Sequence, residues 1–125
     1  MLFISILMPK YLFYKLTYFV CCFTYPNNVG WIAFVQYPTH TKITCKLNIK
    51  PGTYNIRICD FGDARINYQN TGKCDDYFRL AIGANGECNI DMIQGFFINK
   101  FVGKTMKLYA GNEELACGII SWSEK

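Results

Sequence analysis

Residues 43–49 alternate strictly between apolar and polar side chains, and this alternation constrains the fold more than any other feature of the chain. The apolar members are Ile43, Cys45, Leu47 and Ile49. Side chains two residues apart lie on the same side of an extended strand, so a period of two places all four on one face. The segment is therefore predicted to be a half-buried strand of an antiparallel sheet.

A second strand of the same kind is predicted after the turn at Pro51 and Gly52. Tyr54, Ile56 and Ile58 are expected on one face, and Asn55, Arg57 and Cys59 on the other. The strand leads into a Gly-containing turn, 60–63, and then into a polar segment, 61–76. A loop of that length in a small domain is usually functional or a relic of function.

The rest of the chain continues as short strands separated by turns. Further strands are predicted at 17–24, 29–36, 78–82, 87–92, 104–109 and 115–122. About eight short strands without a convincing helix indicate an all-β, eight-stranded antiparallel barrel or sandwich. We expect one such domain over residues 16–125, preceded by an apolar N-terminal extension, 1–15.

The N-terminal extension resembles a signal peptide or a membrane anchor in its apolar character. Lys10 and Lys15 interrupt it, so it contains no uninterrupted apolar run long enough to span a membrane. A secretory signal would carry its positive charge before the apolar region and a small-residue cleavage site after it. We therefore expect no membrane association, and secretion after cleavage stays the less favoured alternative.

Charge and cysteine content exclude two further classes of protein. The net charge is +4, but the Lys and Arg residues are scattered rather than gathered into a basic stripe, so no nucleic-acid partner is expected. The seven cysteines are an odd number and lack paired C-x-x-C motifs, which argues against a zinc ribbon. Several lie in apolar strand patterns, where a free thiol packs as a small hydrophobe.

Several segments, taken in order, resemble the copper/zinc superoxide dismutases. The segment 52–63 (GTYNIRICDFGD) is similar to the strand and turn of that family that carry copper ligands, and 115–120 (LACGII) to its closing segment. The segments 29–36, 102–105 and 111–112 match others in the expected order. The resemblance implies a Greek-key β-barrel.

The departures from the family pattern fall on its metal site. The resemblance places Arg57, Cys59 and Tyr109 where copper ligands would stand, and Glu114 where the family has an arginine that steers superoxide. The only histidine, His40, matches no ligand position. Copper chemistry needs several imidazoles in fixed geometry, so we expect no catalytic residue, no metal or other cofactor and no enzyme activity. Arg57 and Glu114 are expected to form an ion pair across the emptied site.

The resemblance also implies a disulfide from Cys117 to a cysteine of the long loop. Cys74 is the nearest candidate, although it is displaced from the family position. Two reduced thiols in a reducing compartment are an equally weighted alternative.

In losing the metal ligands, the chain resembles the superoxide dismutase-like proteins of poxviruses. This implies a decoy or modulator that binds host superoxide dismutase or its copper chaperone, in the host cytoplasm, the virion or both; the barrel would form a homodimer or a heterodimer. The family's dimer face maps onto Gly62, Asp63, Val102, Gly103 and Trp122. A structural virion protein is the alternative. A redox enzyme that uses Cys59 or Cys74 is the least favoured of the three.

Overall fold

A computed structural model describes residues 16–124, which form eight antiparallel strands and a short 3-10 helix. The strands are β1 (Thr17–Phe23), β2 (Gly30–Gln36), β3 (His40–Leu47), β4 (Gly52–Cys59), β5 (Cys74–Ile82), β6 (Glu87–Gln94), β7 (Thr105–Ala110) and β8 (Glu113–Ser123). The helix η2 (Ile98–Phe101) lies between β6 and β7. The all-β fold class is thereby confirmed. The expected extension, 1–15, lies outside the described residues.

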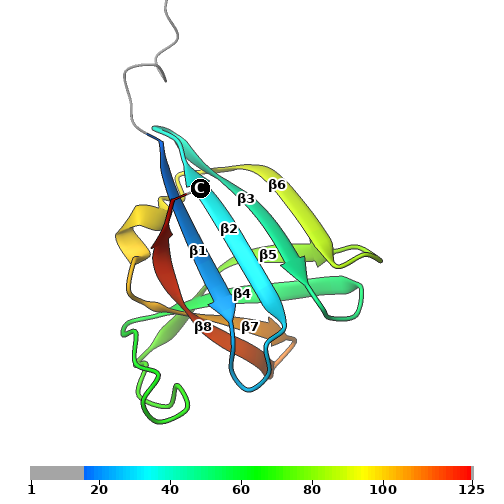
Figure 1. The fold of residues 1–125 in the computed structure, drawn as a ribbon, viewed down its shortest axis with the longest axis vertical. Coiled ribbons are helices and arrows are strands. Elements are labelled where there is room, and N and C mark those ends of the chain that lie inside the picture. The colour runs from blue at the N-terminus through cyan, green and yellow to red at the C-terminus, as the bar shows by residue number, and fades with distance from the viewer. Residues whose placement is uncertain (1–15, 125) are drawn as a thin grey trace, which may run out of the picture.

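The strands form one continuous sheet in the order β5-β4-β7-β8-β1-β2-β3-β6. Pairing of β1 with β8 joins the sequence-distant halves of the sheet, which curls into a nearly closed barrel (Figure 1). The two end strands of the sheet, β5 and β6, make few contacts with each other. The barrel therefore has one seam, between β5 and β6.

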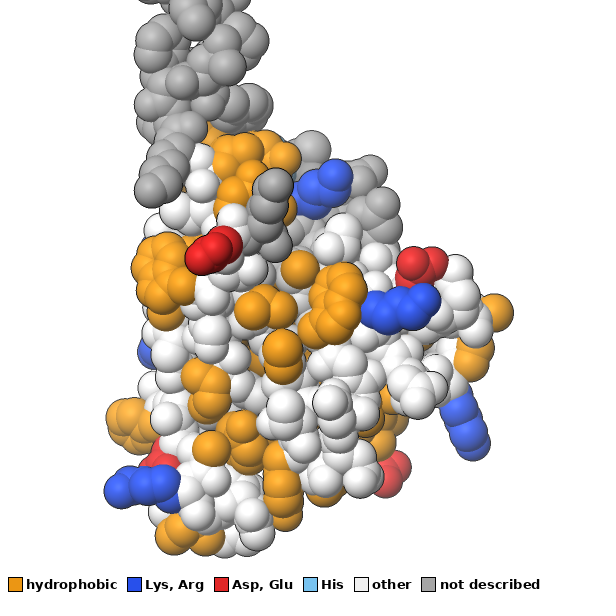
Figure 2. Space-filling view, viewed as in Figure 1, with side chains coloured by type: hydrophobic (Ala, Val, Ile, Leu, Met, Phe, Trp, Pro, Cys, Tyr) orange, Lys and Arg blue, Asp and Glu red, His pale blue; other side chains and the backbone are white. Residues whose placement is uncertain are grey.

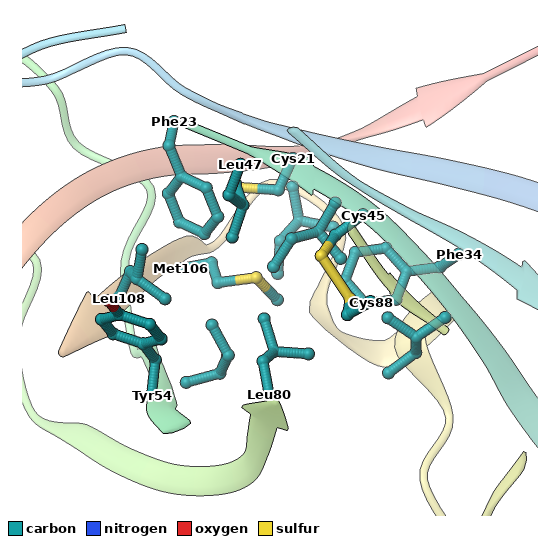
Figure 3. Close-up of a cluster of buried hydrophobic side chains, with 14 of the residues drawn as sticks. Cys21, Phe23, Phe34, Cys45, Leu47, Tyr54, Leu80, Cys88, Met106 and Leu108 are labelled. Atoms are coloured by element: carbon teal, nitrogen blue, oxygen red, sulfur yellow. A yellow bond between two sulfur atoms is a disulfide. The ribbon is translucent and has the colours of Figure 1, made fainter. Parts of the chain in front are cut away.

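The alternation in β3 and β4 follows the sequence expectation except at Cys59, which was expected on the outer face with Arg57 and is instead buried. Ile43, Cys45 and Leu47 of β3 are buried, as are Ile56 and Ile58 of β4. Residues of this kind from all eight strands meet in one hydrophobic core (Figure 3). Burying each such side chain stabilises the fold by roughly 1.5–3 kcal/mol, so the inward faces supply the main driving force for folding.

Two of the core cysteines are bonded to each other rather than packed as free thiols. Cys45 on β3 lies directly opposite Cys88 on β6, and the two form a disulfide inside the core (Figure 3). The bond ties β6, at one edge of the sheet, to its neighbour. Cys21 is a buried free thiol, as the apolar strand pattern leads one to expect.

An aromatic cluster packs beside the seam of the barrel. Phe96 stacks on Phe101 with ring centroids 5.7 Å apart, and Phe101 meets Tyr77 of β5 edge-on at 4.9 Å. The hydroxyl of Thr41 on β3 donates a hydrogen bond to the carbonyl of Phe96 at 2.6 Å. The connection after β6 is thus anchored on both sides of the seam.

Three strands begin earlier than predicted, and one of them, β8, begins at Glu113 instead of Leu115. His40, expected in a turn, is the first residue of β3, where its carbonyl accepts a hydrogen bond from the Tyr37 N–H and its ring stacks on Tyr37. β5 begins at Cys74 instead of Phe78, because 74–76 pair with the end of β4. The loop is therefore 60–73. Within 16–124, no helix has the length and apolar character needed to cross a membrane.

Candidate functional site

Three of the positions singled out by the sequence come together on the outer face of the barrel, where β4, β7 and β8 are neighbours. The Cζ atom of Arg57 lies 4.0 Å from the centroid of the Tyr109 ring. The Tyr109 hydroxyl donates a hydrogen bond to Oε1 of Glu114 at 3.0 Å. All three side chains point outward, because a neighbour of each in its strand faces the core. These neighbours are Ile56, Leu108 and Leu115.

The Glu114 carboxylate is the centre of this polar cluster. Its Oε1 is 3.2 Å from the Lys107 ammonium, and its Oε2 accepts a hydrogen bond from the Cys117 thiol at 3.2 Å. The Lys107 ammonium also donates to the carbonyl of Tyr68 in the loop, at 3.3 Å. Glu114 thus accepts from three different side chains. Sequence reasoning missed Lys107, although the alternation of β7 places it on the same face as Tyr109.

The ion pair expected between Arg57 and Glu114 does not form. Arg57 Nε instead donates to Oδ1 of Asp76 at 2.9 Å. The register of β4 and β5 sets Asp76 directly opposite Arg57, and the guanidinium stacks on the Tyr109 ring, whose hydroxyl reaches Glu114. The prediction was therefore wrong about the pair, and the two residues are linked only through Tyr109.

The surroundings of Cys117 keep its thiol protonated. Burial raises the pKa of Cys117 to about 12, and the hydrogen bond to the Glu114 carboxylate acts in the same direction. Burial also raises the pKa of Glu114, but hydrogen bonds from Cys117 and Lys107 outweigh it and leave that pKa below its usual value. Nucleophilic and redox chemistry use the thiolate, so Cys117 acts here as a hydrogen-bond donor.

The expected disulfide between Cys74 and Cys117 does not form. Cys74 is bonded to Cys59 instead. Cys59 is the last residue of β4 and lies opposite Cys74, the first residue of β5, so the bond closes the two ends of the loop 60–73. Cys117 is on β8 and remains a free thiol. Pairing of β4 with β5 thus gives Cys74 a nearer partner than Cys117.

Arg57, Cys59 and Tyr109, which the sequence resemblance aligned with copper ligands, do not fit a copper ion. Arg57 is a cation, Cys59 is held in a disulfide, and the Tyr109 hydroxyl is a donor to Glu114. His40 lies on β3, which is not a neighbour of β4 in the sheet. Within the described part of the chain, no group of three or more His, Cys, Asp or Glu residues is placed to hold a metal ion.

The residues predicted for a dimer face lie around β8. Gly62 and Gly103 are in close contact, because a Cβ atom added to Gly62 would collide with the Gly103 carbonyl. The N–H of Gly103 donates to the carbonyl of Ile120 at 2.7 Å, and Val102 packs partly against the core. Asp63 is engaged within its own loop, where both carboxylate oxygens accept hydrogen bonds from Arg65.

Trp122, the proposed anchor of that face, is 65% exposed. It lies opposite Phe19 of β1, with ring centroids 4.7 Å apart. Its inner side is therefore supported by the core, while most of the indole stays accessible at the end of β8.

A second surface feature was not singled out from the sequence. The outward-facing side chains of β1 and β2 carry no charge, and we call this surface the β1–β2 face. It consists of Tyr18, Val20, Cys22, Trp31, Ala33 and Val35. Figure 2 shows hydrophobic and uncharged side chains across the middle of this view, with most charged side chains near its border. The signal that could have revealed it is the absence of polar alternation in 17–23 and 30–36, where the residues of both faces are uncharged and mostly apolar.

A scan against models of protein families finds no model that matches the chain.

The disulfide pairing can be tested by peptide mapping under non-reducing conditions. We expect linked peptides containing Cys45 with Cys88 and Cys59 with Cys74, while the exposed Cys22 is alkylated in the folded protein. Alkylation of Cys117 is expected only after unfolding. A peptide linking Cys74 to Cys117 would contradict the assignment.

Acid unfolding provides a second test, at Asp63. Hydrogen bonds from the side chain and backbone of Arg65 lower the pKa of Asp63 to about 2. In the unfolded chain the carboxyl takes up a proton near pH 4, so this residue's contribution to stability is complete above about pH 4 and is lost as the pH falls towards 2.

Urea unfolding at pH 6 and pH 2.5 measures that contribution. We expect Asp63→Asn to lose less stability than the wild type between the two pH values. Arg65→Gln should change the pH dependence in the same direction but by less, because it removes the guanidinium donors and keeps the backbone N–H of residue 65. Identical pH dependence in all three proteins would contradict the Asp63–Arg65 assignment.

Proposed function

We propose that this chain is a non-catalytic, superoxide dismutase-like barrel that works by protein binding. It acts as a decoy or modulator of host superoxide dismutase or of its copper chaperone. The observation that carries the proposal is the uncharged β1–β2 face, which lies beside β8, the strand that carries Trp122 and accepts the hydrogen bond from Gly103.

The mutual arrangement of the family-like segments supports the first part of the proposal. The Thr105 hydroxyl donates to the Phe61 carbonyl at 2.8 Å, and Gly103 contacts both Gly62 and Ile120. Segments 60–63, 102–105 and 115–120, which carry the resemblance, therefore lie side by side. Pairing of β3 with β6 and of β4 with β7 supports a Greek-key path.

The polar cluster supports a non-catalytic role. The Glu114 carboxylate accepts hydrogen bonds from the side chains of Lys107, Tyr109 and Cys117. Arg57 forms an ion pair with Asp76. Arg57 and Lys107 thus have carboxylate partners, and the chain's own loop lies over Lys107 through the Tyr68 carbonyl. This arrangement stabilises the outer face of the barrel rather than presenting groups to a substrate.

The β1–β2 face supports a binding role because charged residues are depleted at the centres of protein interfaces and aromatic residues are enriched there. Cross-strand pairing sets Tyr18 beside Val35, Val20 beside Ala33 and Cys22 beside Trp31, so the apolar groups are contiguous. Contiguous exposed apolar patches mark interaction sites. A partner with a similar barrel surface, or a second copy of the chain, would match it by two-fold symmetry.

The two disulfides favour an oxidising place of action, the virion or the space outside the cell, over the host cytoplasm. Disulfides persist in oxidising surroundings and are rare in reducing ones. This same observation supports the second candidate function, a structural protein of the particle.

Direct binding measurements test the proposal. Purified chain is mixed with copper/zinc superoxide dismutase or its copper chaperone and followed by size-exclusion chromatography with light scattering. We expect a complex that Val20→Glu and Trp122→Glu each weaken at least tenfold, because either change puts a charge into a desolvated contact.

Ile66→Glu is the matched control, since it places the same charge on an exposed side chain of the loop 60–73 and should leave binding unchanged. Absence of a complex with either partner, together with recovery of the chain in purified particles, would favour the structural role. Equal binding by all variants would contradict the proposed face.

A further inference from the structure

We propose that a shallow hollow beside Trp31, at one end of the barrel, binds a neutral sugar ring. The hollow has a volume of about 490 Å³ and lies among three turns of the chain. Its walls come from residues 28–31, 46–49 and 84–86. It is separate from the polar cluster around Glu114, because none of that cluster's residues lines it.

The walls of the hollow are held by backbone contacts and so have a defined shape. The N–H of Leu47 donates to the Gly86 carbonyl at 2.8 Å, and the N–H of Asn48 donates to the Val29 carbonyl at 2.6 Å. A Cβ atom on Gly30 would collide with the Lys46 carbonyl, and one on Gly86 with the Leu47 carbonyl. The glycines thus allow the three turns to approach closely, and the hollow is pre-formed.

Trp31 provides an aromatic surface at this site. It is 41% exposed and points outward from β2, between Cys22 of β1 and Lys46 of β3. It also lines an adjoining hollow of about 400 Å³, next to Thr44 and Glu87. An indole that borders two hollows offers its apolar surface to a ligand lying in either of them.

Two asparagine side chains line the same hollow as the indole. The side chains of Asn28 and Asn48 are exposed and make no hydrogen bond with any residue in the described range 16–124. Each amide both donates and accepts hydrogen bonds. Lys46 lies opposite Glu87 on the neighbouring strand, so the two charges on this wall are of opposite sign and sum to zero.

This combination suits a pyranose better than other ligands. A sugar ring has an apolar face of C–H groups, which can lie on an indole, and a rim of hydroxyl groups that both donate and accept hydrogen bonds, as the amides of Asn28 and Asn48 do. A nucleic acid or another polyanion would require net positive charge, which the Lys46–Glu87 pair does not supply. The ligand class is therefore an uncharged hexopyranose or its N-acetylated form.

The test is a titration of the ¹⁵N-labelled chain with methyl glycosides of glucose, galactose and N-acetylglucosamine, followed by NMR. We expect at least one of them to shift the indole N–H signal of Trp31 and the amide signals of 46–48 and 84–86, with the indole signals assigned in Trp122→Phe. Trp31→Ala should weaken binding at least tenfold, and Asn48→Ala several-fold. Trp31→Phe, which keeps an aromatic face, should weaken it less than Trp31→Ala.

Asn27→Ala removes a neighbouring amide that does not line the hollow, and Val20→Glu changes the β1–β2 face; both should leave sugar binding unchanged. Val20→Glu therefore separates this site from the proposed partner surface. The proposal is overturned if none of the three glycosides shifts these signals, if Trp31→Ala binds as the wild type does, or if only charged sugars bind.

Discussion

The alternation of β4 from Tyr54 to Ile58 is the constraint on which the rest of the structure depends. Ile56 and Ile58 must face inward to complete the barrel core, and the same alternation then forces Arg57 outward, beside Lys107 of β7. Two cations on neighbouring strands need carboxylate partners, and Asp76 and Glu114 supply them from the strands on either side. In the described residues, no buried side-chain nitrogen or oxygen lacks a hydrogen-bond partner.

The polar cluster therefore has a structural explanation that requires no metal. Glu114 joins β7 to β8 through Tyr109 and Lys107, and Lys107 joins both strands to the loop through the Tyr68 carbonyl. The Cys59–Cys74 disulfide closes the base of that loop. What remains available for recognition lies elsewhere, on the β1–β2 face and in the hollow beside Trp31.

The sequence was sufficient to predict all eight strands and the inward faces of β3 and β4, because a period of two is a local property of the chain. It was not sufficient for the partners of Arg57 and Cys74. Those depend on the register between β4 and β5, which sets Arg57 opposite Asp76 and Cys59 opposite Cys74. Register is a tertiary property, and a slip of one residue would have changed every pair. The early start of β3 at His40 was missed because its stacking on Tyr37 leaves no periodic signal.

A double-mutant cycle between Lys107 and Glu114, measured by urea unfolding, tests the central claim that these groups are each other's structural partners. We expect Lys107→Met and Glu114→Gln each to lower the free energy of unfolding. The loss in the double variant should be smaller than the sum of the two single losses, and the difference, the coupling energy, should be about 1 kcal/mol. That coupling would show that the cluster stabilises the outer face of the barrel. Strictly additive losses would contradict the account.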